Sequence, residues 1–152
     1  MVHTIDIKNE KYLVTKQVVF MSIDNAFQMG TSVNTFATKL KAYRLSVTGP
    51  PIIRGRVDFN GGEVLIKKDI MLQFVGNPVT LPKEFEWKEH LKIGPCVYAR
   101  FRGREENLIF ASQKISVYAY ENEIELKKES YTVYVEKTNV AVTIDIFIPH
   151  ED

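Results

Sequence analysis

Residues 140–148 read VAVTIDIFI, and this stretch alternates with the period of a β-strand. Branched aliphatic side chains recur at every second position, and successive side chains of a strand point to opposite faces. The pattern predicts a strand that turns Thr143 and Asp145 outward. Its inward face would carry Val140, Val142, Ile144, Ile146 and Ile148.

This strand closes a half of the chain in which a strand, a helix and two strands follow one another. Strands are expected at Pro95–Arg102, Tyr131–Glu136 and Val140–Ile148, which are rich in β-branched and aromatic residues. A helix is expected at Glu105–Asn122, because apolar side chains recur there at the spacing of one helical face. These side chains are Leu108, Ala111, Ile115 and Tyr118.

The first half of the chain has the same order of elements. Strands are expected at Lys11–Phe20, Ile52–Asp58 and Glu63–Phe74, and Asn60-Gly61-Gly62 supplies the positive-φ residues of a hairpin turn. A helix is expected at Asn25–Arg44, where Asp24 or Asn25 can cap the free N–H groups. Its apolar stripe comprises Met29, Val33, Phe36, Leu40 and Tyr43.

The repeated order predicts an α+β protein built from two strand-helix-strand-strand modules. The modules would form a largely antiparallel sheet with both long helices on one face. The opposite, curved face could form a groove between the modules, which is a usual place for a ligand. We expect a single domain over residues 1–152, with modules at about 11–76 and 94–149 and a connecting loop at 77–93 that holds at most one helical turn. The core would bury Val33, Phe36, Leu40, Leu108, Ile115, Tyr118, Ile144 and Ile146.

Charge and composition exclude several classes of function. Twenty Lys and Arg against nineteen Asp and Glu give a net charge of +1, which does not support direct binding to a nucleic-acid backbone. The single cysteine, Cys96, excludes an internal disulfide and a multi-cysteine zinc site. Neither a secretory signal nor a membrane span is visible. We therefore expect a cytoplasmic protein with no metal, no cofactor and no membrane partner.

Several short motifs resemble those of one known family. They are Gly49-Pro50-Pro51, Gly94-Pro95, Gly103 followed by Leu108 and Ala111, and the closing stretch Ile144–Pro149. In this order and spacing they are similar to the gyrase-inhibitor-like, or effector-binding, domains, over nearly the whole chain from Tyr12 to Pro149. Such domains occur in multidrug-sensing transcription activators of bacteria and also as stand-alone proteins. The resemblance implies a small-molecule-binding protein with an internal duplication.

The chain departs from this family at three positions that the resemblance places in the ligand groove. Members usually carry a Glu-x-Tyr motif; Tyr134 matches the tyrosine, but Thr132 stands in place of the glutamate. Gly55 replaces a usual aromatic residue, and Glu105 replaces a usual tyrosine. A lipophilic cation would therefore lose a fixed negative partner, unless Glu105 supplies one.

The resemblance and these departures predict a non-enzymatic module that binds a small apolar or zwitterionic molecule, or a side chain of a partner protein. The expected ligand-binding residues are Tyr134, Thr132, Tyr98, Glu105 and Trp87. Tyr134 and Trp87 would offer aromatic faces, Thr132 a hydroxyl and Glu105 the nearby charge.

Other interpretations remain open for these residues and for the chain. Tyr134 could simply pack in its strand, Trp87 could cover the end of the sheet, and Glu105 could complement the dipole at the start of a helix. The chain could be a protein-interaction or adaptor module, of the kind associated with Gram-positive toxin-secretion loci. A less favoured alternative is a small-molecule hydrolase with Glu105 or Glu136 as its acid.

Overall fold

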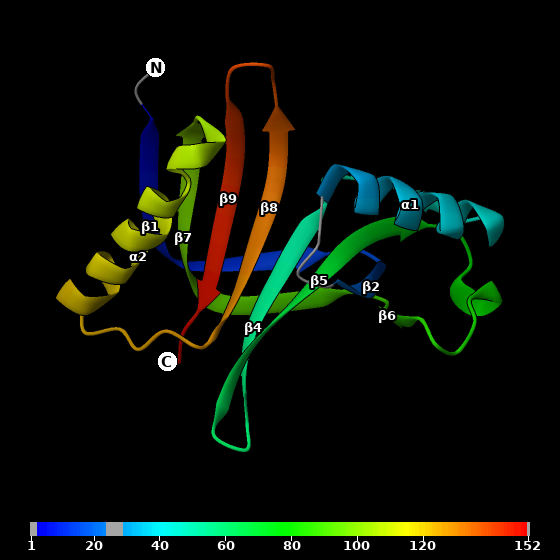
Figure 1. Ribbon diagram of the computed structural model, residues 1–152, viewed down its shortest axis with the longest axis horizontal. Coiled ribbons are helices and arrows are strands. Elements are labelled where there is room, and N and C mark those ends of the chain that lie inside the picture. The colour runs from blue at the N-terminus through cyan, green and yellow to red at the C-terminus, as the bar shows by residue number, and fades with distance from the viewer. Residues whose placement is uncertain (1–2, 24–28, 152) are drawn as a thin grey trace. The chain divides into compact units, whose positions relative to one another are not determined.

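The protein is an α+β protein with antiparallel strands, described here by a computed structural model (Figure 1). The structure describes residues 3–23 and 29–151, without the side chains of residues 29 and 58–60. The chain divides into two compact units. The continuous unit comprises Val14–Leu91, and the split unit combines Met1–Leu13 with Lys92–Asp152.

In the continuous unit the strands lie in the order β4-β5-β2-β6, and the short β3 pairs with the end of β5. The central strand β5 is antiparallel to both of its long neighbours, so that Met71 lies opposite Phe20 on one side and Ile52 on the other. The elements are β2 (Val18–Ile23), α1 (Met29–Ala42), β3 (Ser46–Val47), β4 (Ile52–Asn60), β5 (Glu63–Val75), the 3-10 turn η1 (Pro78–Thr80) and β6 (Glu86–Lys88).

Helix α1 packs on one face of this sheet. Phe36 and Leu40, one turn apart, are fully buried. They meet the even-numbered side chains of β5, because alternate residues of a strand share a face. The buried cluster comprises Val19, Phe36, Leu40, Leu45, Ile70, Leu72 and Phe74.

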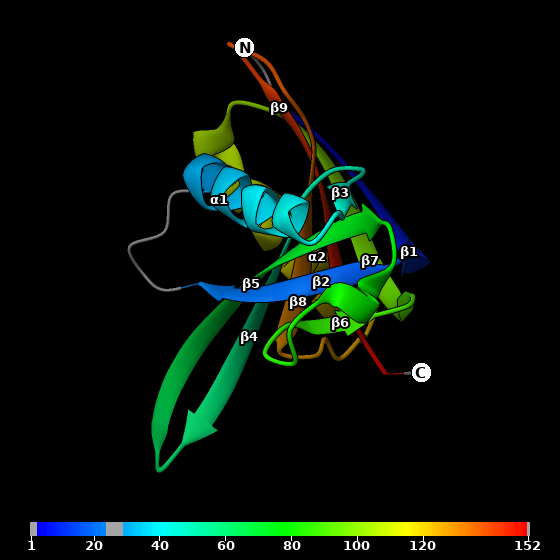
Figure 2. The same cartoon turned by 90° about the vertical axis from the view of Figure 1, so that its right-hand side faces the viewer.

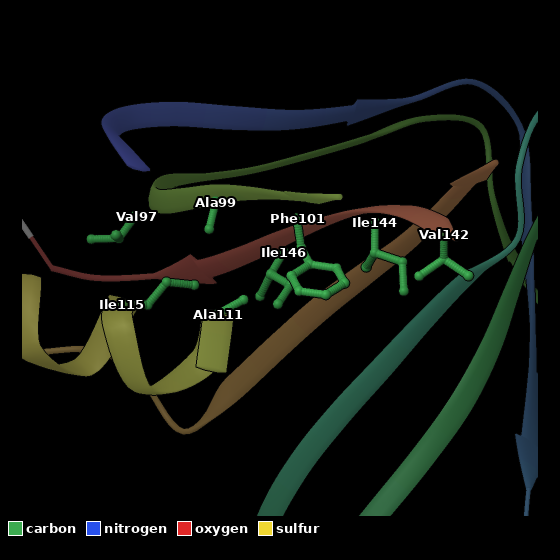
Figure 3. Close-up of a cluster of buried hydrophobic side chains, with 8 residues drawn as sticks. All are labelled: Val97, Ala99, Phe101, Ala111, Ile115, Val142, Ile144 and Ile146. Atoms are coloured by element: carbon green, nitrogen blue, oxygen red, sulfur yellow. The ribbon is translucent and has the colours of Figure 1, made fainter. Parts of the chain in front are cut away.

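The split unit has the same connectivity, with β9 lying between β7 and β8 as β5 lies between β2 and β4. Its elements are β1 (Thr4–Thr15), which runs beside β7 and whose last two residues belong to the continuous unit, β7 (Leu91–Gly103), the 3-10 turn η2 (Glu105–Asn107), α2 (Ile109–Glu121), β8 (Glu129–Lys137) and β9 (Val142–Pro149). Figure 3 shows Ala111 and Ile115 of α2 in one buried cluster with Phe101 of β7 and Ile144 and Ile146 of β9. These contacts form the core of this unit.

The two ends of the continuous unit are joined by a hydrogen bond. The backbone N–H of Leu91 donates to the Thr15 hydroxyl over 3.0 Å. Two further bonds reach from this region to β5: Lys16 N–H donates to Gln73 Oε1 over 3.0 Å, and Phe74 N–H donates to the Gln17 carbonyl over 3.0 Å. The chain therefore enters and leaves this unit at neighbouring points.

The expected fold class is confirmed, and so is the hairpin turn. Gly61 and Gly62 both have positive φ, 60° and 86°, as a two-residue hairpin turn of the primed type requires. Because β2 pairs with Lys68–Gln73 of β5, the outer part of the β4–β5 hairpin extends beyond β2, as Figure 2 shows. In the described part of the chain, neither helix has the length and hydropathy needed to cross a membrane.

Some element boundaries differ from the expectation. The predicted strand Lys11–Phe20 is two strands, β1 and β2, interrupted at Lys16 and Gln17. Helix α1 ends at Ala42, and Arg44 has a left-handed φ of 62°, which stops a helix. The first turn predicted at Glu105 is a 3-10 turn rather than α-helix. The connection at 77–93 contains the short strand β6 as well as η1. The predicted caps Asp24 and Asn25 lie outside the described residues.

The core was also not fully as expected. Phe36, Leu40, Ile115, Ile144 and Ile146 are buried as predicted, whereas Val33, Leu108 and Tyr118 are only half-buried at the edges of the two clusters. Val140 was predicted to point inward but is 69% exposed, because it precedes β9 in the turn after β8. Asp145 was predicted to face outward and is instead buried, since its carboxylate is held by Arg100 and Tyr98.

Candidate functional site

Two of the predicted site residues share one side of the split unit. On β8, Tyr134 lies opposite Ile144 and Thr132 lies opposite Ile146. Residues directly opposite in an antiparallel pair point to the same face. Because Ile144 and Ile146 belong to the core under α2, Thr132 and Tyr134 also point to the helix side, whereas the groove was expected on the opposite face. Tyr134 is half-buried and packs against that core.

Glu105, the first residue of η2, lies near Tyr134. Burial raises the pKa of the Tyr134 phenol, and the negative charge of Glu105 raises it further. Glu105 itself is half exposed, and its Oε1 is 3.6 Å from Nζ of Lys137 at the end of β8. The structure thus brings Thr132, Tyr134 and Glu105 to one region, where the acid has a lysine for a neighbour.

A depression of about 430 Å³ opens beside Glu105. Its charged side chains form two loose pairs, Glu105 with Lys137 and Glu106 with Arg104 at 3.7 Å, both beyond hydrogen-bond distance. The loop after β8 forms the opposite wall, and Thr138 orders it: its N–H donates to the Ala141 carbonyl over 2.8 Å. The lining residues are Arg104, Glu105, Glu106, Lys137, Thr138, Asn139, Val140, Ala141 and Val142. Positive and negative groups are therefore balanced around this depression.

Tyr98 lies on the other side of the same sheet. It pairs with Phe147, and the two ring centroids are 5.0 Å apart. Its hydroxyl donates to Asp145 Oδ1 over 3.0 Å, and Arg100 holds the same carboxylate with Nε at 2.7 Å and Nη2 at 2.8 Å. Burial and the Asp145 carboxylate both raise the pKa of Tyr98. Tyr98 is thus a partner of a buried ion pair, on the face opposite Thr132 and Tyr134.

Trp87, the fifth predicted residue, belongs to the continuous unit. It lies in β6 opposite Val19, a member of the core under α1, and it is 38% exposed. The prediction therefore draws its residues from both units and, within the split unit, from both faces of the sheet. Only Thr132, Tyr134 and Glu105 form a local group.

Sequence reasoning missed a cluster in the continuous unit. Asp69 of β5 is 3% exposed and accepts hydrogen bonds from Arg54 Nε at 2.9 Å, Arg56 Nη2 at 3.0 Å and the Ser22 hydroxyl at 3.0 Å. A signal for it exists in the sequence: the two-residue turn at Gly61-Gly62 sets the register of the hairpin, and that register places Arg54 opposite Asp69.

The described residues contain no group of three His, Cys, Asp or Glu side chains that could hold a metal ion. His150, which is buried, instead contacts Asn9 Oδ1 through Nε2 at 2.8 Å. Cys96 is buried as well, and burial raises the pKa of its thiol to about 11, so that the neutral form persists at ordinary pH. Both side chains serve the packing of the split unit.

No protein-family model and no curated protein matches this chain. Among solved structures, the chain is similar to SAV2435 bound to tetraphenylphosphonium, with a TM-score of 0.50 and 10% sequence identity. The match covers 99% of this chain and 94% of the other. At this identity the similarity shows a shared fold, and it extends over both units.

Proposed function

We propose that this protein is a non-enzymatic module that binds a small neutral or zwitterionic molecule and discriminates against lipophilic cations. The shared fold supports the general part, since the similar protein SAV2435 has a structure with the organic cation tetraphenylphosphonium bound. An internal duplication and the effector-binding family are part of the same proposal, and the strand-helix-strand-strand order that the two units share supports them.

The balance of charge around Glu105 carries the proposed specificity. Thr132 has no charge, and Glu105, the acid whose charge raises the pKa of Tyr134, stands 3.6 Å from Lys137. A monocation beside Glu105 would therefore meet Lys137 as well, and the two interactions largely cancel. A zwitterion gains from both, because its cationic group can approach Glu105 while its anionic group approaches Lys137. Tyr134 would contribute its ring to the apolar part of the ligand.

The same residues do not favour catalysis. The raised pKa of Tyr134 keeps its phenol protonated at neutral pH, so it is a poor nucleophile or base. Glu105 is half exposed to solvent, whereas catalytic acids of this kind are usually desolvated so that they hold a proton near neutral pH.

Isothermal titration with tetraphenylphosphonium and with phenylalanine, a zwitterion with an apolar body, tests the proposal. The unmodified protein should bind tetraphenylphosphonium weakly and phenylalanine more tightly. Lys137→Gln removes the competing charge and should strengthen tetraphenylphosphonium binding by about 1 kcal/mol, roughly fivefold. Thr132→Glu adds an acid on the same side of β8 and should act in the same direction.

Lys39→Gln serves as the matched control, since Lys39 is an exposed lysine of α1 in the other unit. It changes the net charge equally and should leave both affinities unchanged. Micromolar binding of tetraphenylphosphonium to the unmodified protein would contradict the proposed specificity. If no small molecule binds, and one partner protein is recovered in stoichiometric amount, the interaction-module alternative replaces it.

A further inference from the structure

Two guanidinium groups, those of Arg54 and Arg56, share the single carboxylate of Asp69. Oδ2 of Asp69 accepts from Nε of Arg54 and lies 2.9 Å from Nη2 of the same side chain, and it accepts from Nη2 of Arg56 at 3.0 Å. The other oxygen, Oδ1, accepts from the Ser22 hydroxyl. The carboxylate is thus fully satisfied, while this group of three ionised side chains keeps one positive charge in excess.

The buried carboxylate of the split unit has no such excess. Among the described residues, Asp145 is paired with Arg100 alone, which binds both of its oxygens with two parallel hydrogen bonds, and the remaining donor is the neutral hydroxyl of Tyr98. One arginine and one carboxylate neutralise each other there. A second arginine at Asp69 is therefore not needed to compensate a buried aspartate in this fold.

The two arginines of the cluster differ in how firmly they are held. Arg54 is 14% exposed, makes close contacts to Asp69 through two nitrogens and stacks over the ring of Phe20, with its Cζ 4.6 Å from the ring centroid. Arg56 is 38% exposed and donates one hydrogen bond to the described part of the chain. Its Nε is buried and has no hydrogen-bond partner among the described residues. Such a donor is costly in a native protein unless a group from outside the chain can use it.

We propose that Arg56, with Arg54 beside it, forms a binding site for an oxyanion, a carboxylate or phosphate group of a small ligand. Arg56 can reorient toward an external anion at the loss of one hydrogen bond, because Arg54 and Ser22 continue to hold Asp69. The planar guanidinium then offers two parallel donors to the anion. The excess positive charge of the cluster attracts the anion in spite of the nearby Asp69 carboxylate.

This site is independent of the one proposed around Glu105. It lies in the continuous unit, and Asp69 belongs to the odd-numbered residues of β5, whereas the even-numbered Ile70, Leu72 and Phe74 pack under α1. The cluster therefore lies on the face opposite α1. Failure of either site leaves the other unaffected, so separate titrations distinguish them.

Nuclear magnetic resonance of the arginine Nε–H groups tests the proposal directly. The ¹⁵N-labelled protein is titrated with inorganic phosphate, with acetate and with chloride at the same ionic strength. The Nε–H signal of Arg56, assigned as the signal lost in Arg56→Lys, should shift and saturate with phosphate, with acetate or with both. The pattern distinguishes a phosphate site from a carboxylate site. The Arg100 signal should not move, since that side chain is already paired on both carboxylate oxygens.

A variant pair tests the same site by affinity. Arg56→Gln should weaken binding of the effective anion at least about tenfold, the factor typical for loss of one charge-assisted hydrogen bond. Arg102→Gln removes an exposed arginine from β7 and should leave the affinity unchanged. An Arg56 signal that does not move, or that moves equally with chloride, would overturn the proposal, as would equal affinities of the two variants.

Discussion

Asp69 of β5 and Asp145 of β9 are buried acids on corresponding strands of the two units. Each lies in the strand that is central in its unit, on the face away from the helix, and each is buried. The arginines come from different neighbours, however. Arg54 lies opposite Asp69 on β4, whereas Arg100 lies opposite Asp145 on β7, the strand that corresponds to β2. Each unit thus has a buried acid on the corresponding strand and face, and the arginine that neutralises it lies on the opposite neighbouring strand.

The Asp145 ion pair should contribute measurably to stability. Asp145→Asn removes the charge that holds Arg100 and Tyr98, and we expect a loss of about 1.5–3 kcal/mol in the free energy of unfolding, as for hydrogen bonds to charged groups. Urea denaturation at neutral pH measures it. Glu106→Gln is the control, because Glu106 is 71% exposed and 3.7 Å from Arg104, and it should cost less than about 0.5 kcal/mol. Equal effects of the two variants would contradict this assignment.

The two buried clusters should respond strongly to truncation. Phe36→Ala in the continuous unit and Ile144→Ala in the split unit each remove a fully buried side chain. Each should lower the free energy of unfolding by about 2–5 kcal/mol, as measured by urea denaturation. Val140→Ala removes an aliphatic side chain that is 69% exposed and should change it by less than about 0.5 kcal/mol. An unchanged free energy of unfolding would show that the stripe of α1 is misassigned in the case of Phe36→Ala, and the inward face of β9 in the case of Ile144→Ala.

Stability should fall in alkaline solution partly because of Cys96. Burial raises the pKa of its thiol from an ordinary 9.0 to about 11 in the folded protein. As the pH rises, the thiol of the unfolded chain therefore ionises before that of the folded protein. The stabilising contribution of the neutral Cys96 thiol to the free energy of unfolding is complete below pH 9 and is lost between pH 9 and 11. Above pH 11 this group causes no further change. The loss over this range is up to roughly 2–3 kcal/mol. Cys96→Ala should lack it, and denaturation of both proteins across this pH range measures the difference. Parallel pH profiles would contradict the prediction.

The pKa of Tyr134 should depend on the charge of Glu105. Because that carboxylate helps to raise the pKa of the phenol, Glu105→Gln should lower it toward the ordinary value for tyrosine. Titration of tyrosinate absorbance in each protein, with Tyr134→Phe used to identify the signal, measures the change. Glu121→Gln, which removes an exposed acid at the end of α2, should leave the titration unaltered. A titration insensitive to Glu105 would separate the two residues and weaken the proposed site.

Side-chain periodicity predicted those elements in which one face carries mainly apolar residues and the other mainly polar residues. The strand β9 and the stripe of α1 were found in this way, because apolar side chains recur in them at strand and helix spacing, although β9 is buried on both faces. The break at Lys16 and Gln17 was not predictable, because its hydrogen bonds reach Gln73 and Phe74 on β5. The local sequence around Lys16 and Gln17 does not indicate hydrogen-bond partners so distant along the chain.

The sequence indicated which residue types could form a binding site, but not the face of the sheet to which each side chain points. Tyr98 and Tyr134 are both strand tyrosines, yet only their registers with β9 show that they point to opposite sides of the sheet. Burial of Asp145 was missed for a related reason. An aspartate in an alternating strand is expected to be solvated. Its burial becomes favourable because Arg100 lies opposite it on β7. In the β4–β5 hairpin the turn fixes the register, so the pairing of Arg54 with Asp69 could have been predicted.

The continuous unit is an insertion within the split unit, and the hydrogen bond between Leu91 and Thr15 holds its two ends together. Its residues emerge from the ribosome before Lys92–Asp152, so it can complete its own sheet while β1 still awaits β7. The split unit must then close across the whole insertion, at an entropic cost that grows only slowly with the length of the closed segment. Biogenesis of this chain should accordingly proceed from the inside outward, and a circular permutant opened within the insertion would reverse that order.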